Sequence, residues 1–343
     1  MLLIGLMIIA IGAFCLSSSY VPISKVKEWS WESFWLVQGV FAWLVFPILG
    51  AMLSVPSGHS FFELFAPENS FNICMTVLFG VLWGVGGLTF GLSMRYLGVA
   101  LGQSISLGTC AALGTILGPV MLAIFYPEAG HLAKLTGSVV TGVAVTLAGI
   151  AVIGLAGMRK SREVGDKDGE SSVKEFNFPK GIAVALLSGF MSACFNIGLS
   201  FGETLTWPET SEIFKTLPAT LFVTIGGFVT NVSYCVYQNF RNKSFSGYSK
   251  GSVWGNDLVF CALAGLLWYS QFFGLSLGKG FLVGHDTLII FSFCILMALD
   301  IVFSNVWGII LKEWKGCSQK TITILLAGIA ILVISCFIPQ LLG

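Results

Sequence analysis

Apolar residues dominate ten stretches of the chain, and short polar loops separate them. Each stretch is about 20 residues or longer, which is the length that a helix needs to cross a hydrocarbon core of about 30 Å. A helix also satisfies its own backbone hydrogen bonds, which lipid cannot do. The pattern therefore predicts ten transmembrane helices. They cover residues 2–22, 33–55, 72–94, 97–124, 134–156, 181–202, 217–239, 258–278, 287–311 and 321–342.

The loops between these stretches differ in charge. Of the 18 Lys and Arg residues, 15 lie in the loops that follow the odd-numbered stretches, and only Lys134, Lys215 and Lys279 lie in the other loops. Lys and Arg concentrate in loops that stay in the cytoplasm. The pattern predicts that the odd-numbered loops are cytoplasmic and that both termini lie on the outer side.

Composition narrows the class of protein. The chain is 55% hydrophobic and 10% charged, with a mean hydropathy of +0.88, whereas soluble domains carry about 25% charged residues. The net charge of +1 argues against electrostatic binding of nucleic acid. The nine cysteines lie mostly singly inside the spans, without a CxxC pair or a Cys/His cluster. We interpret them as small buried hydrophobic residues and expect no metal site.

A polar run at residues 159–180 divides the chain into five spans on each side. Its composition is typical of a solvated cytoplasmic linker between a first half, residues 1–158, and a second half, residues 181–343. Because five is odd, the second half must run inverted through the membrane, as in many secondary transporters. A short internal repeat supports this division, since GVLW at 80–83 and GLLW at 265–268 hold the third span of each half.

Glycines four residues apart recur on single helix faces, where they allow helices to touch closely. This spacing predicts tight helix packing. A second interpretation is that such smooth contacts also allow helices to slide between conformations. The stripes include Gly80, Gly84, Gly87 and Gly91 in the third span and Gly274 and Gly278 in the eighth.

Charged residues inside the spans are candidate coupling sites because each one costs free energy to insert. Asp300 is the only one between Thr287 and Leu311, and Ser304 follows one turn later on the same face. Asp300 is a candidate for binding and releasing a proton, and the alternative is a structural hydrogen bond to a neighbouring helix. Asp286 opens the same span and is either a second proton or sugar site or a cap of the helix N-terminus.

The eighth span combines aromatic rings with an amide group at Trp268, Tyr269 and Gln271, and Trp83 and Gln38 lie in the third and second spans. A flat ring covers the C–H face of a sugar while amides bond its hydroxyls. We therefore predict that these five side chains bind a neutral polyhydroxylated ligand. The alternative is that the rings pack or anchor at the membrane interface and that the amides bridge helices.

Five segments along nearly the whole chain resemble the L-rhamnose–proton symporter family of the drug/metabolite transporter superfamily. They are residues 20–32 with VKEWSWE at 26–32, 78–86 (LFGVLWGVG), 91–98 (GLSMRYLG), 267–273 (LWYSQFF) and 311–314 (LKEW). The resemblance implies ten helices in two inverted five-helix halves in a bacterial inner membrane. It also implies uptake of L-rhamnose, or a related sugar such as L-lyxose, with a proton, and it favours Asp286 over Asp300 as the acidic residue of the ninth span.

We therefore expect an all-α integral membrane protein that works as a secondary active transporter by alternating access. Its expected partners are L-rhamnose, a proton and the lipid bilayer, with no cofactor and no nucleic acid. The chain contains no HExxH pair and no Walker loop, so an enzyme is the least favoured class. Two alternatives stay open: a proton-independent facilitator or exporter of another small metabolite, and a membrane sugar sensor. The sequence leaves the oligomeric state open.

Overall fold

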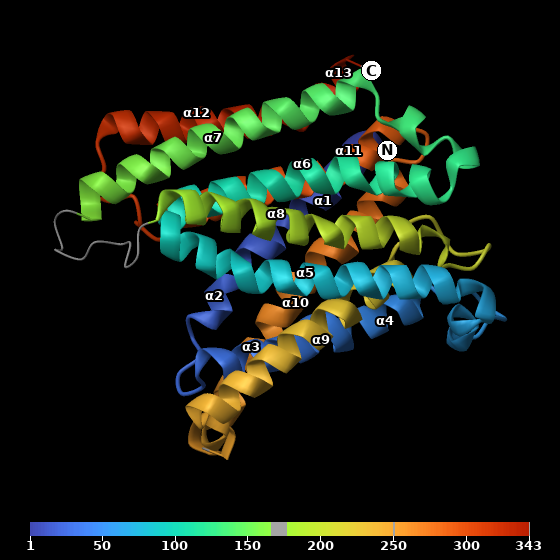
Figure 1. The fold of residues 1–343 in the computed structure, drawn as a ribbon, viewed down its shortest axis with the longest axis horizontal. Coiled ribbons are helices and arrows are strands. Elements are labelled where there is room, and N and C mark those ends of the chain that lie inside the picture. Colours follow the sequence, from blue (N-terminus) through green and yellow to red (C-terminus); the bar gives the residue numbers. More distant parts are fainter. Residues whose placement is uncertain (166–176, 250, 343) are drawn as a thin grey trace. The chain divides into compact units, whose positions relative to one another are not determined.

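The computed structural model describes residues 1–165, 177–249 and 251–342, and in these residues it contains helices and turns but no β-strand (Figure 1). Within these described residues, nine helical segments are long and apolar enough to cross a membrane. The predicted tenth span corresponds to a shorter apolar helix, α12 (Gln319–Ser335). The all-helical membrane class is thus confirmed. The nine segments are Leu2–Ile23, Trp31–Leu53, Pro67–Leu97, Leu101–Phe125, Gly137–Val164, Phe178–Thr204, Leu217–Asn242, Trp254–Phe281 and Asp286–Ile310.

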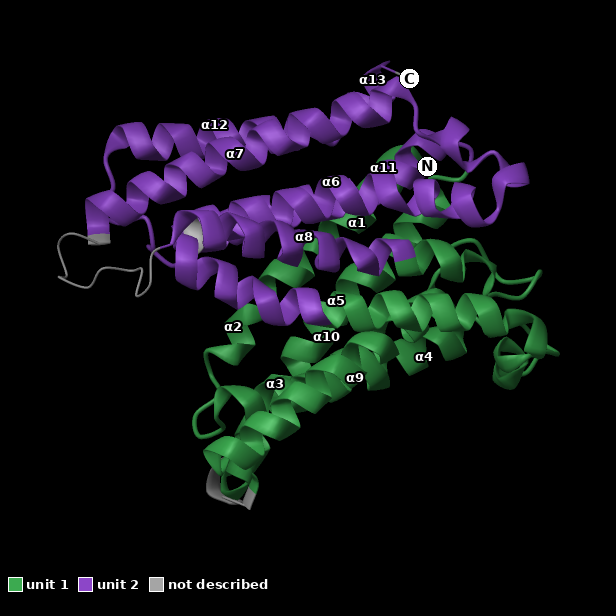
Figure 2. Cartoon of the chain, viewed as in Figure 1, with its two compact units in different colours: residues 1–84, 198–283 green, residues 85–197, 284–343 purple. Residues whose placement is uncertain are grey.

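The chain forms two compact units, and each contains helices from both sides of the predicted linker (Figure 2). Unit 1 comprises residues 1–84 and 198–283, and unit 2 comprises residues 85–197 and 284–343. These units do not test the predicted halves, which stay a prediction. Of the predicted linker 159–180, residues 159–165 continue a helix, α8 begins at Phe178, and residues 166–176 lie outside the described residues.

Unit 1 contains both segments of the predicted internal repeat, residues 80–83 and residues 265–268. Glycines bring its first helix against α10: a Cβ added to Gly5 would lie 2.9 Å from Gly278 O, and one added to Gly274 would lie 3.1 Å from Gly12 Cα. The predicted packing role of Gly274 and Gly278 is therefore confirmed. The helices of this unit are α1 (Leu2–Ser18), α2 (Tyr20–Ile23), α3 (Trp31–Val40), α4 (Phe46–Leu53), the start of α5 (Ser70–Leu97), the end of α8 (Phe178–Phe201), α9 (Leu217–Asn242) and α10 (Gly251–Phe281).

The glycine stripe of α5 has two different environments. A Cβ on Gly80 would collide with Val223 O of α9, and one on Gly84 would lie 2.7 Å from Thr230 Cβ. In contrast, apart from the adjacent residues and the backbone of the same helix, no described atom lies within 4 Å of such a Cβ on Gly87 or Gly91. Tight packing therefore explains the first two glycines of the stripe and leaves the other two unexplained.

The segment before α3 is held by a carboxylate on α10. Asp257 is fully buried and accepts the backbone N–H groups of Lys27 at 3.0 Å, Glu28 at 3.1 Å and Trp29 at 3.2 Å. The Trp29 ring packs edge-on against Tyr248, with 5.3 Å between ring centroids. A buried carboxylate is tolerated where hydrogen bonds replace its hydration. These bonds give the VKEWSWE segment a structural role at the start of the second span.

Unit 2 is held by packed helix pairs with hydrogen bonds between their polar side chains. Thr146 Oγ1 on α7 donates to Ser335 Oγ on α12 at 2.9 Å, and Asn196 Nδ2 on α8 donates to Gly114 O on α6 at 2.7 Å. A Cβ on Gly328 would lie 2.6 Å from Ile153 Cγ1, so α12 and α7 lie close together. The unit contains the end of α5, α6 (Val99–Phe125), α7 (Gly137–Gly165), most of α8, α11 (Asp286–Ile310), α12 and α13 (Ile338–Leu342).

Short helical turns lie in the loops. They are the 3-10 turns η2 (Phe61–Phe65), η3 (Pro67–Asn69), η4 (Pro127–Ala129), η5 (His131–Lys134), η6 (Gly202–Thr204) and η7 (Ser244–Ser249). The turn η1 (Phe41–Val45) is of a different kind: it lies inside the second span and is π-helical.

Candidate functional site

Four tryptophans of unit 1 meet in one group, which we call the tryptophan cluster: Trp35, Trp43, Trp83 and Trp268. The Trp43 ring lies edge-to-face with the other three, at centroid distances of 5.7, 6.0 and 5.9 Å respectively. Trp83 and Trp268 lie 5.6 Å apart with 32° between their planes. Two of the five predicted sugar contacts, Trp83 of α5 and Trp268 of α10, are therefore brought together, and Trp43 is the member that touches every other ring.

Trp43 lies on the π turn η1, and the sequence contains the cause of that turn. Pro47 has no N–H, and in a regular α-helix its ring clashes with the carbonyl four residues earlier, which here belongs to Trp43. The helix widens instead, and Phe46 donates its N–H to Phe41 O, five residues back. Such π turns occur frequently at functional sites. The turn gives Trp43 a position that a regular helix would not give it.

Glycines make room for the rings of the cluster. A Cβ on Gly227 of α9 would collide with the Trp83 ring, and one on Gly39 would lie 2.5 Å from the Trp43 ring. On α10, a Cβ on Gly265 would lie 3.0 Å from Gln38 O and 2.8 Å from Phe41 Cβ. The backbone of α10 therefore packs directly on the end of α3 and the start of the π turn.

Buried polar atoms without partners occur on the same elements. Gln38, Trp43 and Tyr269 are 2%, 4% and 5% exposed. Their Oε1, Nε1 and hydroxyl atoms have no hydrogen-bond partner among the described residues. The Trp35 indole differs, because its Nε1 donates to Asn231 Oδ1 at 3.0 Å. Unpaired donors and acceptors beside stacked rings are what a site for a hydroxylated ligand requires.

The remaining two predicted sugar contacts have other neighbours. The Tyr269 ring stacks on Phe46 at 6.5 Å, and its hydroxyl approaches Gly50 so closely that no Cβ would fit there. Gln271 donates its amide N–H to Trp268 O of its own helix at 2.9 Å. A Cβ on Gly12 would lie 3.1 Å from Gln271 O, so this turn of α10 also packs on α1. A ligand role for Tyr269 and for Gln271 stays a prediction.

The two candidate coupling carboxylates lie on α11 in unit 2 and differ in environment. Asp286 is the first residue of the helix and is exposed. Asp300 lies in the middle of the helix and is partly exposed, and its Oδ1 is buried without a partner among the described residues. Its carboxylate also forms a hydrogen bond with Ser304, the residue one turn later. The surroundings of Asp286 therefore fit a helix N-terminus, and those of Asp300 fit a group inside a span.

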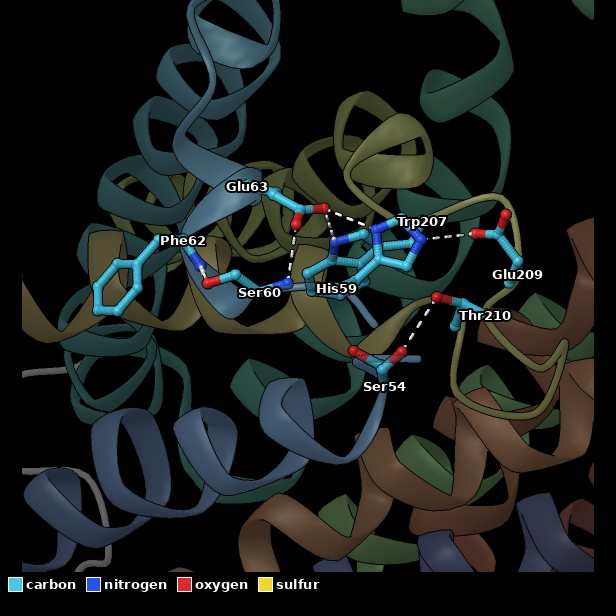
Figure 3. Close-up of polar contacts among 8 residues, drawn as sticks. All are labelled: Ser54, His59, Ser60, Phe62, Glu63, Trp207, Glu209 and Thr210. Carbon is cyan, nitrogen blue, oxygen red and sulfur yellow. Dashed lines mark hydrogen bonds and ion pairs between the residues drawn. The ribbon is translucent and has the colours of Figure 1, made fainter. Parts of the chain in front are cut away.

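A charged cluster joins two loops of unit 1 (Figure 3). His59 places Nδ1 2.7 Å from Glu63 Oε2 and Nε2 3.1 Å from Glu209 Oε2. Glu63 also accepts the Trp207 indole N–H at 3.0 Å. The hydrogen bond to Glu63 raises the pKa of His59, and the same bond lowers the pKa of Glu63. The cluster ties residues 59–63, before α5, to residues 207–209, before α9.

A serine-hydrolase spacing, GxSxG, occurs at residues 274–278. Catalytic serines of that motif sit on a sharp turn between a strand and a helix. Here the segment lies inside α10, where Ser276 is buried and donates to Ile213 O at 3.0 Å. The structure gives this serine a packing role.

Among the described residues no group of three or more His, Cys, Asp or Glu side chains is arranged to hold a metal ion.

Sequence reasoning missed Trp43 and Trp35, although a signal for Trp43 was present. Pro47 stands in the middle of the second span, where proline disturbs a helix, and Trp43 is the residue whose carbonyl it affects. Asp257 was also missed as an anchor, because the predicted eighth span began one residue after it. Both cases depend on what a neighbouring helix presents, which hydropathy does not reveal.

A known protein family and several known proteins match almost the entire length of this chain. The family described as L-rhamnose-proton symport protein (RhaT) matches residues 1–342. A protein of Mannheimia succiniciproducens named L-rhamnose-proton symporter is 30% identical over 348 residues, covering 97% of this chain and 96% of that protein. Proteins of the same name from Yersinia pestis and Yersinia pseudotuberculosis are 29% identical, with the same coverage.

Proposed function

The chain belongs to the L-rhamnose-proton symport protein family, and from this membership we propose that it takes up L-rhamnose together with a proton. Members of this family are proton-coupled sugar transporters, so the chain is a multi-pass membrane transporter and not an enzyme. The proposed part is the identity of the sugar, the residues that bind it and the mechanism.

The tryptophan cluster with its unpaired buried polar atoms is the observation that carries this proposal. L-Rhamnose has hydroxyl groups on its ring and an apolar methyl group. Trp83 and Trp268 lie against each other, with 5.6 Å between their ring centroids, and form one aromatic surface for the C–H and methyl groups. Gln38 Oε1 is a buried acceptor for a hydroxyl, and Tyr269 and Gln271 complete the predicted contacts. Aromatic faces combined with a few polar groups are typical of small-molecule sites.

Proton coupling is assigned to a carboxylate of α11. The buried Oδ1 and the position inside the span support Asp300, and the family resemblance favours Asp286. The carboxylate is protonated from outside, sugar binds to the protonated form, and the proton leaves on the cytoplasmic side. In this proposal the protein lies in a bacterial inner membrane with both termini on the periplasmic side, as the distribution of basic residues predicts.

Paired contacts support the proposed architecture of two inverted five-helix halves. Inside unit 1, Gly80 of the third span contacts Val223 of the seventh, and Gly265 of the eighth span contacts Gln38 of the second. In the two proposed halves the third span corresponds to the eighth, and the second span corresponds to the seventh. The contact between the third and seventh spans is therefore equivalent to the contact between the eighth and second spans. The fifth and tenth spans, α7 and α12, also pack together, and this contact is unchanged when the two halves are exchanged. Alternating access follows from rocking of one half against the other.

The test is transport by the purified full-length chain in liposomes. Uptake of labelled L-rhamnose is measured with and without an inward proton gradient, with L-lyxose as a second sugar. Concentrative uptake that a protonophore abolishes is the expected result. Uptake that ignores the gradient would replace the symporter with a facilitator. Binding without flux would indicate a sensor, and no response to either sugar would reject the substrate.

A further inference from the structure

We propose that Trp43 determines sugar specificity: its indole N–H, presented by the π turn, donates a hydrogen bond to one hydroxyl of the bound sugar. This inference rests on the proposed function, since it places one further contact in the same site. It adds a residue that the hydropathy pattern and the internal repeat did not single out.

The position of Trp43 is the first argument. Its ring contacts Trp35, Trp83 and Trp268, which come from α3, α5 and α10. Trp83 and Trp268 are the two rings predicted to cover the apolar face of the sugar. The Trp43 ring, which carries the N–H donor, therefore lies directly beside the two rings on which the sugar is proposed to stack.

The unpaired donor is the second argument. Trp43 is 4% exposed, and its Nε1 has no hydrogen-bond partner among the described residues. A buried N–H that bonds to nothing costs free energy, and phenylalanine would fill similar space without that cost. The adjacent Trp35 shows the ordinary solution, because Asn231 accepts its N–H at 3.0 Å. Trp43 has no such acceptor, which leaves its donor for a ligand.

The backbone supplies the third argument. The π turn η1 is formed where Pro47 prevents a regular helix, and it carries Trp43 at its centre. One turn before it, Gln38 places an unpaired Oε1 in the same packed region, where Gly265 of α10 brings the two helices together. A donor and an acceptor of this kind can bond two hydroxyls of one sugar ring.

Trp29 provides a matched control for the chemical change. Its Nε1 is also buried without a partner among the described residues, but its ring packs on Tyr248 and is not part of the tryptophan cluster. Trp43→Phe and Trp29→Phe each keep an aromatic ring and remove one unpaired N–H. A general effect of that removal would appear in both variants, and an effect on the sugar site would appear only in Trp43→Phe.

The experiment measures binding by calorimetry to the full-length protein in lipid nanodiscs. The ligands are L-rhamnose, L-lyxose and L-rhamnose analogues that each lack one hydroxyl. We expect Trp43→Phe to bind L-rhamnose about tenfold more weakly, the usual effect of one lost hydrogen bond, while Trp29→Phe binds it as the parent does. We also expect one analogue to bind Trp43→Phe and the parent protein equally. The parent alone should bind that analogue about tenfold more weakly than L-rhamnose, which requires no variant to fold.

Two results would overturn the assignment. One is unchanged L-rhamnose affinity in Trp43→Phe, with or without lower thermal stability, which would mean that the N–H faces a neighbouring ring. The other is an equal loss for every analogue, which would mean that only the shape of the site changed. In one mixed outcome, Trp43→Phe binds a sugar more weakly than the parent does, but the parent does not accumulate that sugar against a gradient. The Trp43 assignment then stands and the proposed symport is rejected. If the parent binds none of these sugars, both fail.

Discussion

The two units differ in how many of their buried side-chain polar atoms lack a hydrogen-bond partner among the described residues. Among the described residues, eight buried side-chain N or O atoms lack a hydrogen-bond partner; seven belong to unit 1, and the eighth is Asp300 Oδ1 in unit 2. In unit 2, Thr146, Asn196 and Ser188 are instead bonded to neighbouring helices. Lipid cannot satisfy a polar group, so a buried polar group in a membrane protein pairs with another group, binds a ligand or an ion, or costs free energy. The comparison supports the proposal that unit 1 recognises the sugar and that Asp300 of unit 2 binds the proton.

The largest expected effect is at Asp300. Asp300→Asn keeps the size of the side chain but cannot ionise, so we expect it to abolish accumulation driven by a proton gradient. Exchange of labelled for unlabelled sugar across the liposome membrane should continue, because binding is retained. Asp286→Asn makes the same change at the exposed start of α11 and should retain most of the accumulation. The reverse pattern would assign the coupling role to Asp286.

Gly227→Ala should have the next largest effect, on the sugar site of unit 1. The added Cβ would collide with the Trp83 ring, so the tryptophan cluster must rearrange. We expect L-rhamnose affinity to fall at least about tenfold, measured by calorimetry. Gly91→Ala on α5 is the control, since no described atom of another helix lies within 4 Å of its Cβ and alanine is the better helix former. Equal affinity in both variants would separate the cluster from sugar binding.

Gln38→Leu tests an unpaired atom directly. We expect L-rhamnose to bind about tenfold more weakly. We expect thermal stability to stay the same or rise, because a buried unpaired polar group costs about 1–3 kcal/mol. Calorimetry and thermal unfolding of the same preparation measure both quantities. Lower stability with unchanged affinity would show that the oxygen serves packing, as the polar groups of unit 2 do.

Thr146→Val is the converse test in unit 2. Valine keeps the shape but removes the hydroxyl, which donates to either Ser335 Oγ or Gly142 O and accepts from Cys294 Sγ. We expect a loss of about 0.5–1.5 kcal/mol in stability and unchanged sugar uptake. Thr141→Val on the same helix is the control, because Thr141 is exposed and its hydroxyl donates to Gly137 O within α7. Impaired uptake with normal stability would contradict the division between the two units.

The smallest expected effect is a pH dependence of the tie between the loops of unit 1. The His59 pKa is raised, so its bonds are complete below that pKa and are lost as pH rises through it. The Glu63 pKa is lowered, so its contribution is present above that pKa and is lost as pH falls through it. The tie is therefore strongest between the two pKa values.

Hydrogen exchange at the Ser60 N–H reports on this tie, because that group donates to Glu63 Oε1 at 2.8 Å. We expect His59→Gln to exchange faster than the parent within the window and at the same rate above it. Lys215→Gln, a change in an exposed pair elsewhere in the same loop region, serves as the control. A parent-to-variant ratio that is constant with pH would exclude the histidine as the titrating group.

The sequence alone determined the class of the protein and the course of most of its helices. Apolar runs of about 20 residues cross a membrane whatever their partners are, so nine of the ten predicted spans appear as long helices and the tenth as α12. The glycines Gly80, Gly84, Gly274 and Gly278 were also correctly predicted as contact points. The spacing of glycines along one helix depends only on that helix, so it can be read directly from the sequence.

Only the tertiary structure decided which polar side chains are paired. Trp35 and Trp43 lie on one span and have the same side chain, yet Asn231 on α9 accepts one N–H and nothing among the described residues accepts the other. Asp257, near the start of α10, holds the backbone of Lys27 and Trp29, more than 200 residues away. Hydropathy and spacing describe one helix at a time, whereas hydrogen bonding depends on atoms that the fold brings from distant parts of the chain.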